Sequence, residues 1–245
     1  MSHAQQYHWW EFAARAAAIV ALTVWYGTLF LVRRCCGAPP ALTYTIFPQW
    51  ARAVLRAAGV RLQVRGTEHC QQGIPLVLVA NHCSLFDIPV LMVASPVPVR
   101  ILYKRELERV PFLGWALKCS TFIPVERERP QTAGKTVHTA IASLARDPAA
   151  LIVFPEGTRS RDGSLGPFRR GAFAIAFATG RQLVPVAIIG SGQVLPPTTL
   201  RFNRGTIEVV FLPPVQPPPF RSRTDERQWI EHLRHNILAA LDRAS

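Results

Sequence analysis

The sequence predicts an α/β fold, in which a central and mostly buried sheet is flanked by helices and preceded by an N-terminal helix-turn-helix segment. From residue 61 onward, short runs of β-branched residues alternate with helical patterns, as in sheets that are covered by helices. A long uncharged run lies ahead of them near the N-terminus. Hydrophobic residues make up 49% of the 245 residues and charged residues 18%, which excludes a disordered chain and supplies one sizeable core.

The first apolar run covers residues 16–32 and carries no charge. A 17-residue helix spans about 25 Å, slightly less than the ~30 Å hydrocarbon core of a bilayer. Trp9 and Trp10 precede the run and Arg33 and Arg34 follow it, as in interfacial segments. A cleaved signal peptide is disfavoured because the run starts late and ends without a small-x-small site. A core helix is disfavoured because this helix would be apolar all round.

A second helix is expected over residues 42–58, with Pro48 marking its start or a kink and Gly59 ending it. We interpret residues 1–60 as a membrane anchor that spans once or lies in one leaflet, and residues 61–245 as the main domain. Two arginines follow the first run, whereas Arg15 alone precedes it. This bias favours the cytoplasm for the main domain.

Seven strands are predicted in the main domain, over residues 62–64, 75–79, 99–103, 122–125, 151–154, 184–189 and 206–211. Two helices are predicted from apolar positions spaced three or four residues apart. The first carries Val137, Ile141 and Leu144. The last carries Ile230, Leu233, Ile237 and Leu241, and Thr224 or Asp225 is its expected N-cap.

The chain is strongly basic, with 28 Lys and Arg against 15 Asp and Glu and a formal net charge of +13. Such a charge suits nucleic acid, an anionic membrane surface or an acidic small substrate. The five cysteines (Cys35, Cys36, Cys70, Cys83 and Cys119) are odd in number and form no CxxC pair. They therefore indicate neither a zinc site nor a disulfide framework, but reduced thiols in a protein that faces the cytosol.

A candidate catalytic pair follows the predicted strand at 75–79. His82 precedes Asp87 by five residues, at the point where a buried strand passes into a helix, which is where α/β proteins place their sites. An imidazole is a suitable general base at neutral pH, and a carboxylate on its other nitrogen fixes the tautomer. Cys83 and Ser84 lie beside it. We disfavour a covalent mechanism, because neighbouring side chains in the sequence usually point apart.

A candidate anion site follows the predicted strand at 151–154. Glu156, Gly157, Thr158 and Arg159 come directly after this strand. Glycine permits close backbone approach, threonine offers a hydroxyl, and arginine offers a bidentate fork for phosphate. A solvated basic turn explains these residues about equally well. Lys104 and Arg127 each end another predicted strand. From there each side chain could bind a phosphate, although a charge in such a position is more commonly just exposed to solvent.

Four blocks in order resemble the glycerolipid acyltransferases of the 1-acylglycerol-3-phosphate O-acyltransferase family, from about residue 62 to residue 214. The first is an NHx4D block at residues 81–87, the third FPEGTRS at 154–160, and the fourth VPV at 184–186. The second block lies at 104–127 and departs from the family pattern. Thr121 stands in place of the usual glycine, Pro124 lies in the strand, and Glu126 replaces a common aspartate.

The resemblance implies a membrane enzyme that moves a fatty acyl chain from acyl-CoA or acyl-carrier protein to the sn-2 hydroxyl of 1-acylglycerol-3-phosphate, giving phosphatidic acid. It implies His82 as the base and Asp87 as its orienting partner. Glu156, Gly157, Thr158 and Arg159, with Lys104 and Arg127, would hold the acceptor. No cofactor or metal is implied, since a thioester is already activated. The expected partners are membrane lipids, the lysophospholipid and the acyl donor, at a bacterial-type inner membrane with the catalytic domain facing the cytoplasm.

Two alternatives stay open at this point. The departures in the second block suggest the same chemistry on another lysolipid, such as one that contains an amino acid. The net charge alone suggests a non-enzymatic basic protein that binds lipid or nucleic acid. Against nucleic acid, the arginines are scattered and no RNA- or DNA-binding signature is present.

Overall fold

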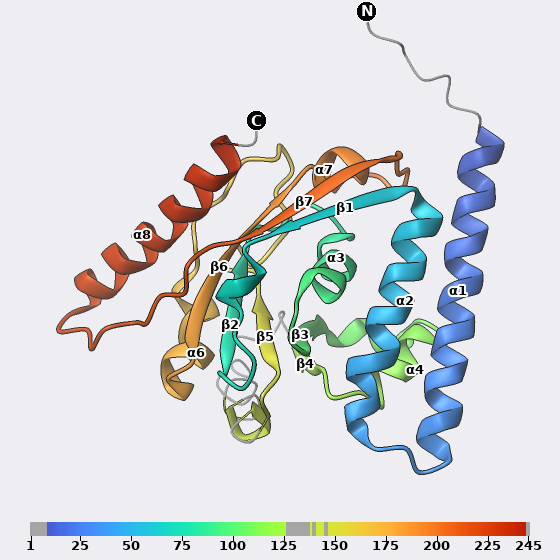
Figure 1. The fold of residues 1–245 in the computed structure, drawn as a ribbon, viewed down its shortest axis with the longest axis horizontal. Coiled ribbons are helices and arrows are strands. Elements are labelled where there is room, and N and C mark those ends of the chain that lie inside the picture. The colour runs from blue at the N-terminus through green and yellow to red at the C-terminus, as the bar shows by residue number, and fades with distance from the viewer. Residues whose placement is uncertain (1–8, 126–137, 139–140, 145–146, 244–245) are drawn as a thin grey trace, which may run out of the picture.

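The computed structural model describes residues 9–125, 138, 141–144 and 147–243, and its centre is a seven-stranded sheet with helices on both faces (Figure 1). The strand order is β1-β7-β6-β2-β5-β3-β4. The strands are β1 (Val60–Arg65), β2 (Leu76–Ala80), β3 (Val99–Lys104), β4 (Ile123–Val125), β5 (Ala150–Val153), β6 (Gln182–Ile189) and β7 (Gly205–Phe211). All seven lie within two residues of their predicted bounds, so the predicted α/β fold is confirmed.

The sheet topology brings the two candidate sites together. β2 pairs in parallel with β5 on one side and with β6 on the other, so the carboxyl ends of these strands lie at one edge of the sheet. The segments 81–87 and 154–160 begin at the ends of β2 and β5. Only β7 runs antiparallel to its neighbour β6, and β1 pairs in parallel with β7. Pro124 is accommodated because β4 is an edge strand.

Each face of the sheet has its own apolar core, because successive strand residues point to opposite faces. Leu76 and Leu78 of β2 pack under α2 (Thr43–Ala58) and α3 (Asp87–Ala94). Val77 and Val79 of the same strand pack on the side of α6 (Ala174–Thr179) and α8 (Arg223–Asp242). Figure 1 shows α6 and α8 on one side of the sheet and α1 to α4 on the other.

The final helix differs from its prediction at its start. Its N-cap is Ser222, whose hydroxyl accepts from the backbone amide of Asp225, and not Thr224 or Asp225 as expected. Ser222 has the extended backbone that an N-cap needs. The apolar stripe is confirmed, with Ile230, Leu233 and Ile237 buried. The other predicted helix is described only in part: residues 141–144 are helical, and Val137 lies outside the described residues.

The first N-terminal helix is longer than its apolar run alone suggested. α1 (Trp9–Cys35) has 27 residues, about 40 Å at the helical rise, because it extends past both ends of the uncharged stretch. It is the one described helix long and apolar enough to cross a membrane, and little of it is buried within the protein. A 3-10 turn at Pro40–Leu42 leads directly into α2, so α2 begins before Pro48 and not at it. Gly59, with φ of +77°, ends α2 as expected.

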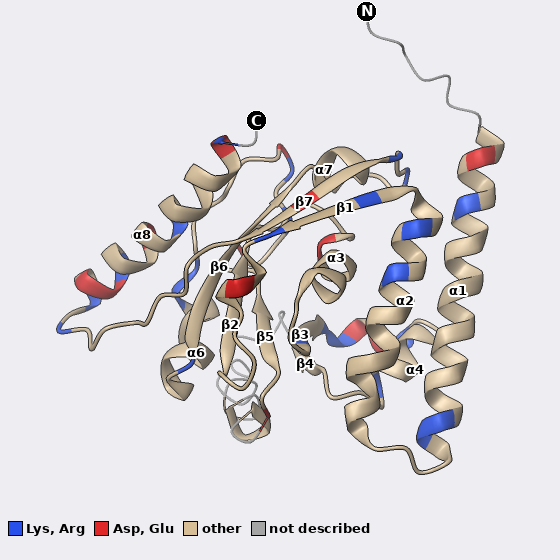
Figure 2. Ribbon diagram, in the orientation of Figure 1, with Lys and Arg blue, Asp and Glu red and all other residues tan. Residues whose placement is uncertain are grey.

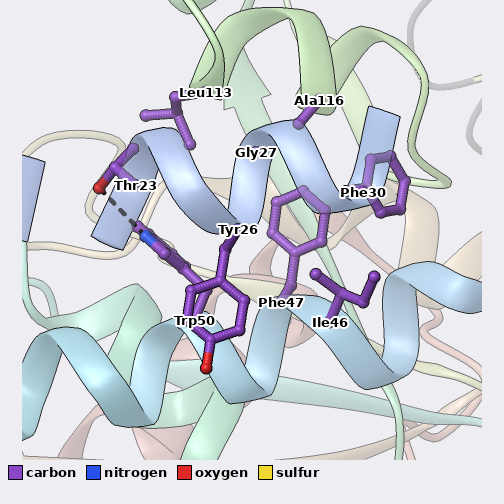
Figure 3. A pocket seen from close by; sticks show the side chains of 9 residues that line it. All are labelled: Thr23, Tyr26, Gly27, Phe30, Ile46, Phe47, Trp50, Leu113 and Ala116. Carbon is purple, nitrogen blue, oxygen red and sulfur yellow. Dashed lines mark hydrogen bonds between the residues drawn. The ribbon is translucent and has the colours of Figure 1, made fainter. Parts of the chain in front are cut away.

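α1 packs against both α2 and α4 (Leu113–Lys118), and the three helices line a small apolar pocket (Figure 3). The indole of Trp50 on α2 donates to the Thr23 hydroxyl on α1 at 3.2 Å. Gly27 is buried against the loop before α4: a Cβ there would lie 3.1 Å from Cβ of Phe112. Backbone contact at Gly27 therefore sets how closely α1 approaches α4.

We expect Gly27→Leu to destabilise the protein, because a larger side chain must push α1 away from Phe112. Overpacking of this kind costs about 1–3 kcal/mol of unfolding free energy. Thr28→Leu is the matched control, since Thr28 is exposed on the same helix and should change stability by less than about 0.5 kcal/mol. Thermal unfolding in detergent measures both variants. Equal stability of the two would contradict close packing at Gly27.

Candidate functional site

The His82–Asp87 pair is built around a buried carboxylate. Asp87 is the first residue of α3 and is fully buried. Its Oδ2 accepts from the backbone amides of Cys83 and Ser84, each at 2.8 Å, and lies 2.7 Å from Nδ1 of His82. A carboxylate on Nδ1 favours the tautomer that carries its proton there, which leaves the lone pair on Nε2. The imidazole is thus oriented with its basic nitrogen away from Asp87.

Two further contacts fix His82, and neither was assigned from the sequence. The ring stacks on Phe154, with centroids 4.1 Å apart and planes 19° from parallel. Asn81, just before it, exchanges two hydrogen bonds with the backbone of Ile188 on β6, at 2.9 and 2.7 Å. The sequence signal for both is position, since Asn81 and Phe154 begin the first and third blocks and directly follow β2 and β5.

Glu156 lies beneath this site and holds the backbone of His82. Only 6% of Glu156 is exposed. Its Oε1 accepts from the amide of His82 at 2.8 Å, and its Oε2 accepts from the amide of Gly166 at 3.0 Å. In return, the amide of Ser160 donates to the carbonyl of His82 at 2.8 Å. Burial raises the pKa of Glu156 above its ordinary value, against the opposing effect of these amides.

The loop that follows Glu156 forms a basic pocket of about 280 Å³. Its lining includes Thr158 and three arginines, Arg159, Arg161 and Arg169. Gly157 has φ of +76°, and a Cβ on it would lie 3.2 Å from the side chain of Arg169. The pocket also contains the exposed Asp162, whose pKa is lowered to about 2 by hydrogen bonds from Ser164 and Ser160. The three guanidinium groups and the Thr158 hydroxyl make this pocket suitable for an anion.

The structure places the predicted site residues that it describes at the carboxyl ends of neighbouring parallel strands, with Lys104 one strand further along than the rest. His82, Asp87, Glu156, Gly157, Thr158 and Arg159 all follow the neighbouring strands β2 and β5. Lys104 ends β3, on the far side of β5 from β2, where it is exposed and lies 3.8 Å from Glu106. Arg127 lies outside the described residues.

The two nucleophile side chains beside His82 are both buried. Burial and the nearby charge of Asp87 raise the pKa of the Cys83 thiol to about 11, which keeps it protonated at neutral pH. The Ser84 hydroxyl donates to the carbonyl of Leu195 at 2.9 Å and accepts from the amide of Phe86. Across the described residues, no three His, Cys, Asp or Glu side chains gather in a way that would hold a metal ion.

Glu156→Gln should remove a pH-dependent contribution to stability. Because the folded state raises the pKa of Glu156, it binds this proton more tightly than the unfolded chain does. The contribution is therefore fully present below the ordinary value of 4.5 and is lost as pH rises through the folded pKa. We expect the stability of the parent, relative to that of Glu156→Gln, to fall as pH rises above 4.5 and through the folded-state pKa.

Denaturant unfolding of both proteins at several pH values measures this difference, and other titrating groups cancel in it. A difference that rises with pH would contradict the assignment. A constant offset of about 1–3 kcal/mol is also expected, because glutamine can accept from only one of the two amides.

Comparisons with known proteins identify the family and support the fold. The sequence pattern of the acyltransferase family matches residues 61–189. A 1-acyl-sn-glycerol-3-phosphate acyltransferase from Pseudomonas aeruginosa is 35% identical over 68% of this chain and 63% of its own length. One from Brassica napus is 32% identical over 63% of this chain and 45% of its own length. The chain thus matches less than two thirds of the length of each of these relatives.

A solved structure has the same fold. The 1-acyl-sn-glycerophosphate acyltransferase PlsC from Thermotoga maritima superposes with a TM-score of 0.79 over 96% of both chains, at 23% sequence identity. Because the superposition covers 96% of this chain, it includes α1 and α2 as well as the sheet. The family pattern covers more than half of the chain, including both blocks that build the site, and this protein therefore belongs to the acyltransferase family.

Proposed function

We propose that this protein transfers a fatty acyl chain from an acyl thioester to the sn-2 hydroxyl of 1-acylglycerol-3-phosphate, which gives phosphatidic acid. The donor is acyl-CoA or acyl-carrier protein. The observation that carries the proposal is the oriented imidazole of His82, held by Asp87 and Glu156 directly beside a pocket with three arginines. The names of the relatives support the same acceptor.

The reaction needs one base and no covalent enzyme intermediate. Nε2 of His82 takes the proton from the acceptor hydroxyl while the oxygen attacks the thioester carbonyl. Asp87 stabilises the imidazolium that forms. The tetrahedral intermediate collapses with release of the thiolate, which takes the proton from His82. The new ester bond thus replaces the thioester bond, and the imidazole returns to its neutral form. Burial of Cys83 and Ser84 supports this direct route over an acyl-enzyme.

In this proposal the acceptor phosphate binds Arg159 and the hydroxyl of Thr158, and Gly157 gives the loop its close turn. Glu156 acts differently from the other residues of its block. Both of its oxygens accept from backbone amides, and a carboxylate would repel the phosphate. We therefore assign Glu156 the role of positioning His82. Lys104 ends β3, the strand beside β5, and does not line the pocket, so we assign the phosphate to Arg159 first.

The site is also proposed to work at a membrane. The exposed apolar length of α1 and the two arginines at its end support residues 1–60 as the anchoring segment, with residues 61–245 carrying out the reaction. The lysolipid acceptor resides in the bilayer and the thioester arrives from the water, so a site at this boundary meets both. We propose the bacterial-type inner membrane, with the catalytic domain facing the cytoplasm.

His82→Ala should lower kcat by about 10²–10⁴-fold, because the general base is lost. Cys83→Ala is the matched control, since it removes the neighbouring thiol and should leave kcat close to that of the parent. The measurement is phosphatidic acid formed from lysophosphatidic acid with acyl-CoA or acyl-carrier protein. If Cys83→Ala lost activity and His82→Ala kept it, the result would contradict base catalysis by His82 and support an acyl-enzyme on Cys83.

Arg159→Ala should raise the KM for lysophosphatidic acid about tenfold to a hundredfold, the value of a charge-assisted bidentate contact. Activity on monoacylglycerol, which lacks the phosphate, should change far less. Arg221→Ala is the control, since Arg221 is exposed and outside the pocket. An equal rise in KM for both acceptors would contradict the phosphate assignment. In the same panel, preference for a lysolipid that contains an amino acid would identify that lipid as the acceptor.

A further inference from the structure

We propose that the segment from η3 (Arg105–Arg109) through α4 (Leu113–Lys118) is a second membrane-contact surface, which binds an anionic phospholipid bilayer beside α1. This inference rests on the proposed function only in that the protein works at a membrane. It adds a contact from the main domain itself, which would fix how that domain is oriented at the bilayer.

The first observation is where the exposed apolar side chains lie. Leu107, Val110 and Trp115 are each 40% to 50% exposed. Eleven large apolar residues are exposed among the described residues, and eight of them lie on this segment or on α1. The other three are Val64, Leu85 and Leu200. Scattered exposed apolar residues need no explanation, whereas a concentration on two adjoining elements indicates an interaction surface.

The second observation is the charge around these apolar residues. Exposed basic residues flank them on both sides, Lys104, Arg105 and Arg109 before Val110 and Lys118 after Trp115. The acidic residues of the segment have partners at the end of β3, since Glu106 lies 3.8 Å from Lys104 and Glu108 accepts from the hydroxyl of Tyr103. Figure 2 shows basic positions on α1, on α2 and between β3 and α4. An apolar centre with a basic rim suits the boundary of an anionic leaflet.

The third observation is that the segment is held rigidly against α1. Phe112 has φ of +60°, the one positive φ outside glycine in the described residues, and its backbone meets Gly27 of α1. Gly114 lets the two halves of the segment close on each other, because a Cβ there would lie 2.3 Å from the carbonyl oxygen of Leu107. The segment is therefore packed directly against α1, and moving it away from α1 would break these close backbone contacts.

A bilayer fits this surface better than a protein partner does. α1 and α4 pack against each other, so a bilayer that takes up α1 lies close to this segment. Trp115 and Phe112 have rings 5.2 Å apart, and aromatic side chains with basic neighbours are typical of the headgroup region. A second copy of this chain would need a complementary acidic surface, which the net charge of +13 disfavours.

The test uses an environment-sensitive fluorophore, NBD, on a cysteine at position 110 of the full chain. The exposed Cys35, Cys36 and Cys119 are first replaced by serine, while the buried Cys70 and Cys83 are kept. Val110→Cys is compared with Val20→Cys on α1, the anchor reporter, and with Val64→Cys on β1, which is exposed on the edge strand at the other end of the sheet. Each labelled protein is reconstituted into vesicles of phosphatidylcholine and phosphatidylglycerol, with or without brominated acyl chains.

We expect NBD at positions 110 and 20 to shift its emission to the blue and to be quenched by brominated chains, while NBD at position 64 keeps its aqueous emission. Vesicles of phosphatidylcholine alone should weaken the signal at 110 by about threefold or more, because the basic rim loses its counter-charge. Aqueous emission at 110 with insertion at 20 would overturn the inference and leave the anchor intact. Aqueous emission at both positions would instead count against the membrane location itself. A blue shift at 110 that grows with protein concentration in the absence of lipid would identify a second copy as the occupant.

Discussion

The buried carboxylate of Asp87 is the constraint on which the rest of the site depends. A charge without solvent is stable only when polar groups surround it, and here two backbone amides and the Nδ1 nitrogen of His82 converge on one oxygen. Its place at the first turn of α3 adds the favourable field of the helix N-terminus. The interactions that make this charge tolerable are the same ones that shape the turn after β2 and orient the imidazole. The turn after β2 and the orientation of the His82 imidazole therefore depend on the same hydrogen bonds.

The two buried acids of the site are neutralised mainly by backbone amides. Glu156, like Asp87, accepts from main-chain nitrogens, whereas two buried arginines away from the site are satisfied in other ways. Arg100 pairs with Asp147, and Arg181 donates to the carbonyls of Leu144, Ala149 and Asp147. This division matters electrostatically. Because backbone amides donate to Asp87 and Glu156, neither acid needs an arginine of the 157–166 loop as its partner.

Contacts that are local in the chain could be predicted from the sequence, and contacts between distant segments could not. The seven strands follow from β-branched runs, and the His82–Asp87 pair follows from a spacing of five residues. By contrast, Glu156 reaches the amide of His82 across 74 residues, and Asn81 reaches Ile188 across 107. Those contacts depend on which strands are neighbours in the sheet. Two details of the helices likewise depend on backbone geometry that residue type alone does not determine. Ser222 is the N-cap of α8, and Pro48 lies inside α2 and not at its start.

The hydrogen bond from the amide of Ser160 to the carbonyl of His82 has a consequence for how this protein can change over time. It ties the loop proposed to recognise the acceptor to the residue proposed to do the chemistry. Substitutions that reshape the loop for a new acceptor will also shift the imidazole, so their effects on binding and on turnover will not be independent. Acceptor preference in this protein would then evolve mainly through paired changes, one in each loop. Random libraries confined to residues 157–166 should yield mostly slow variants, with improved ones enriched when positions 81–86 vary as well.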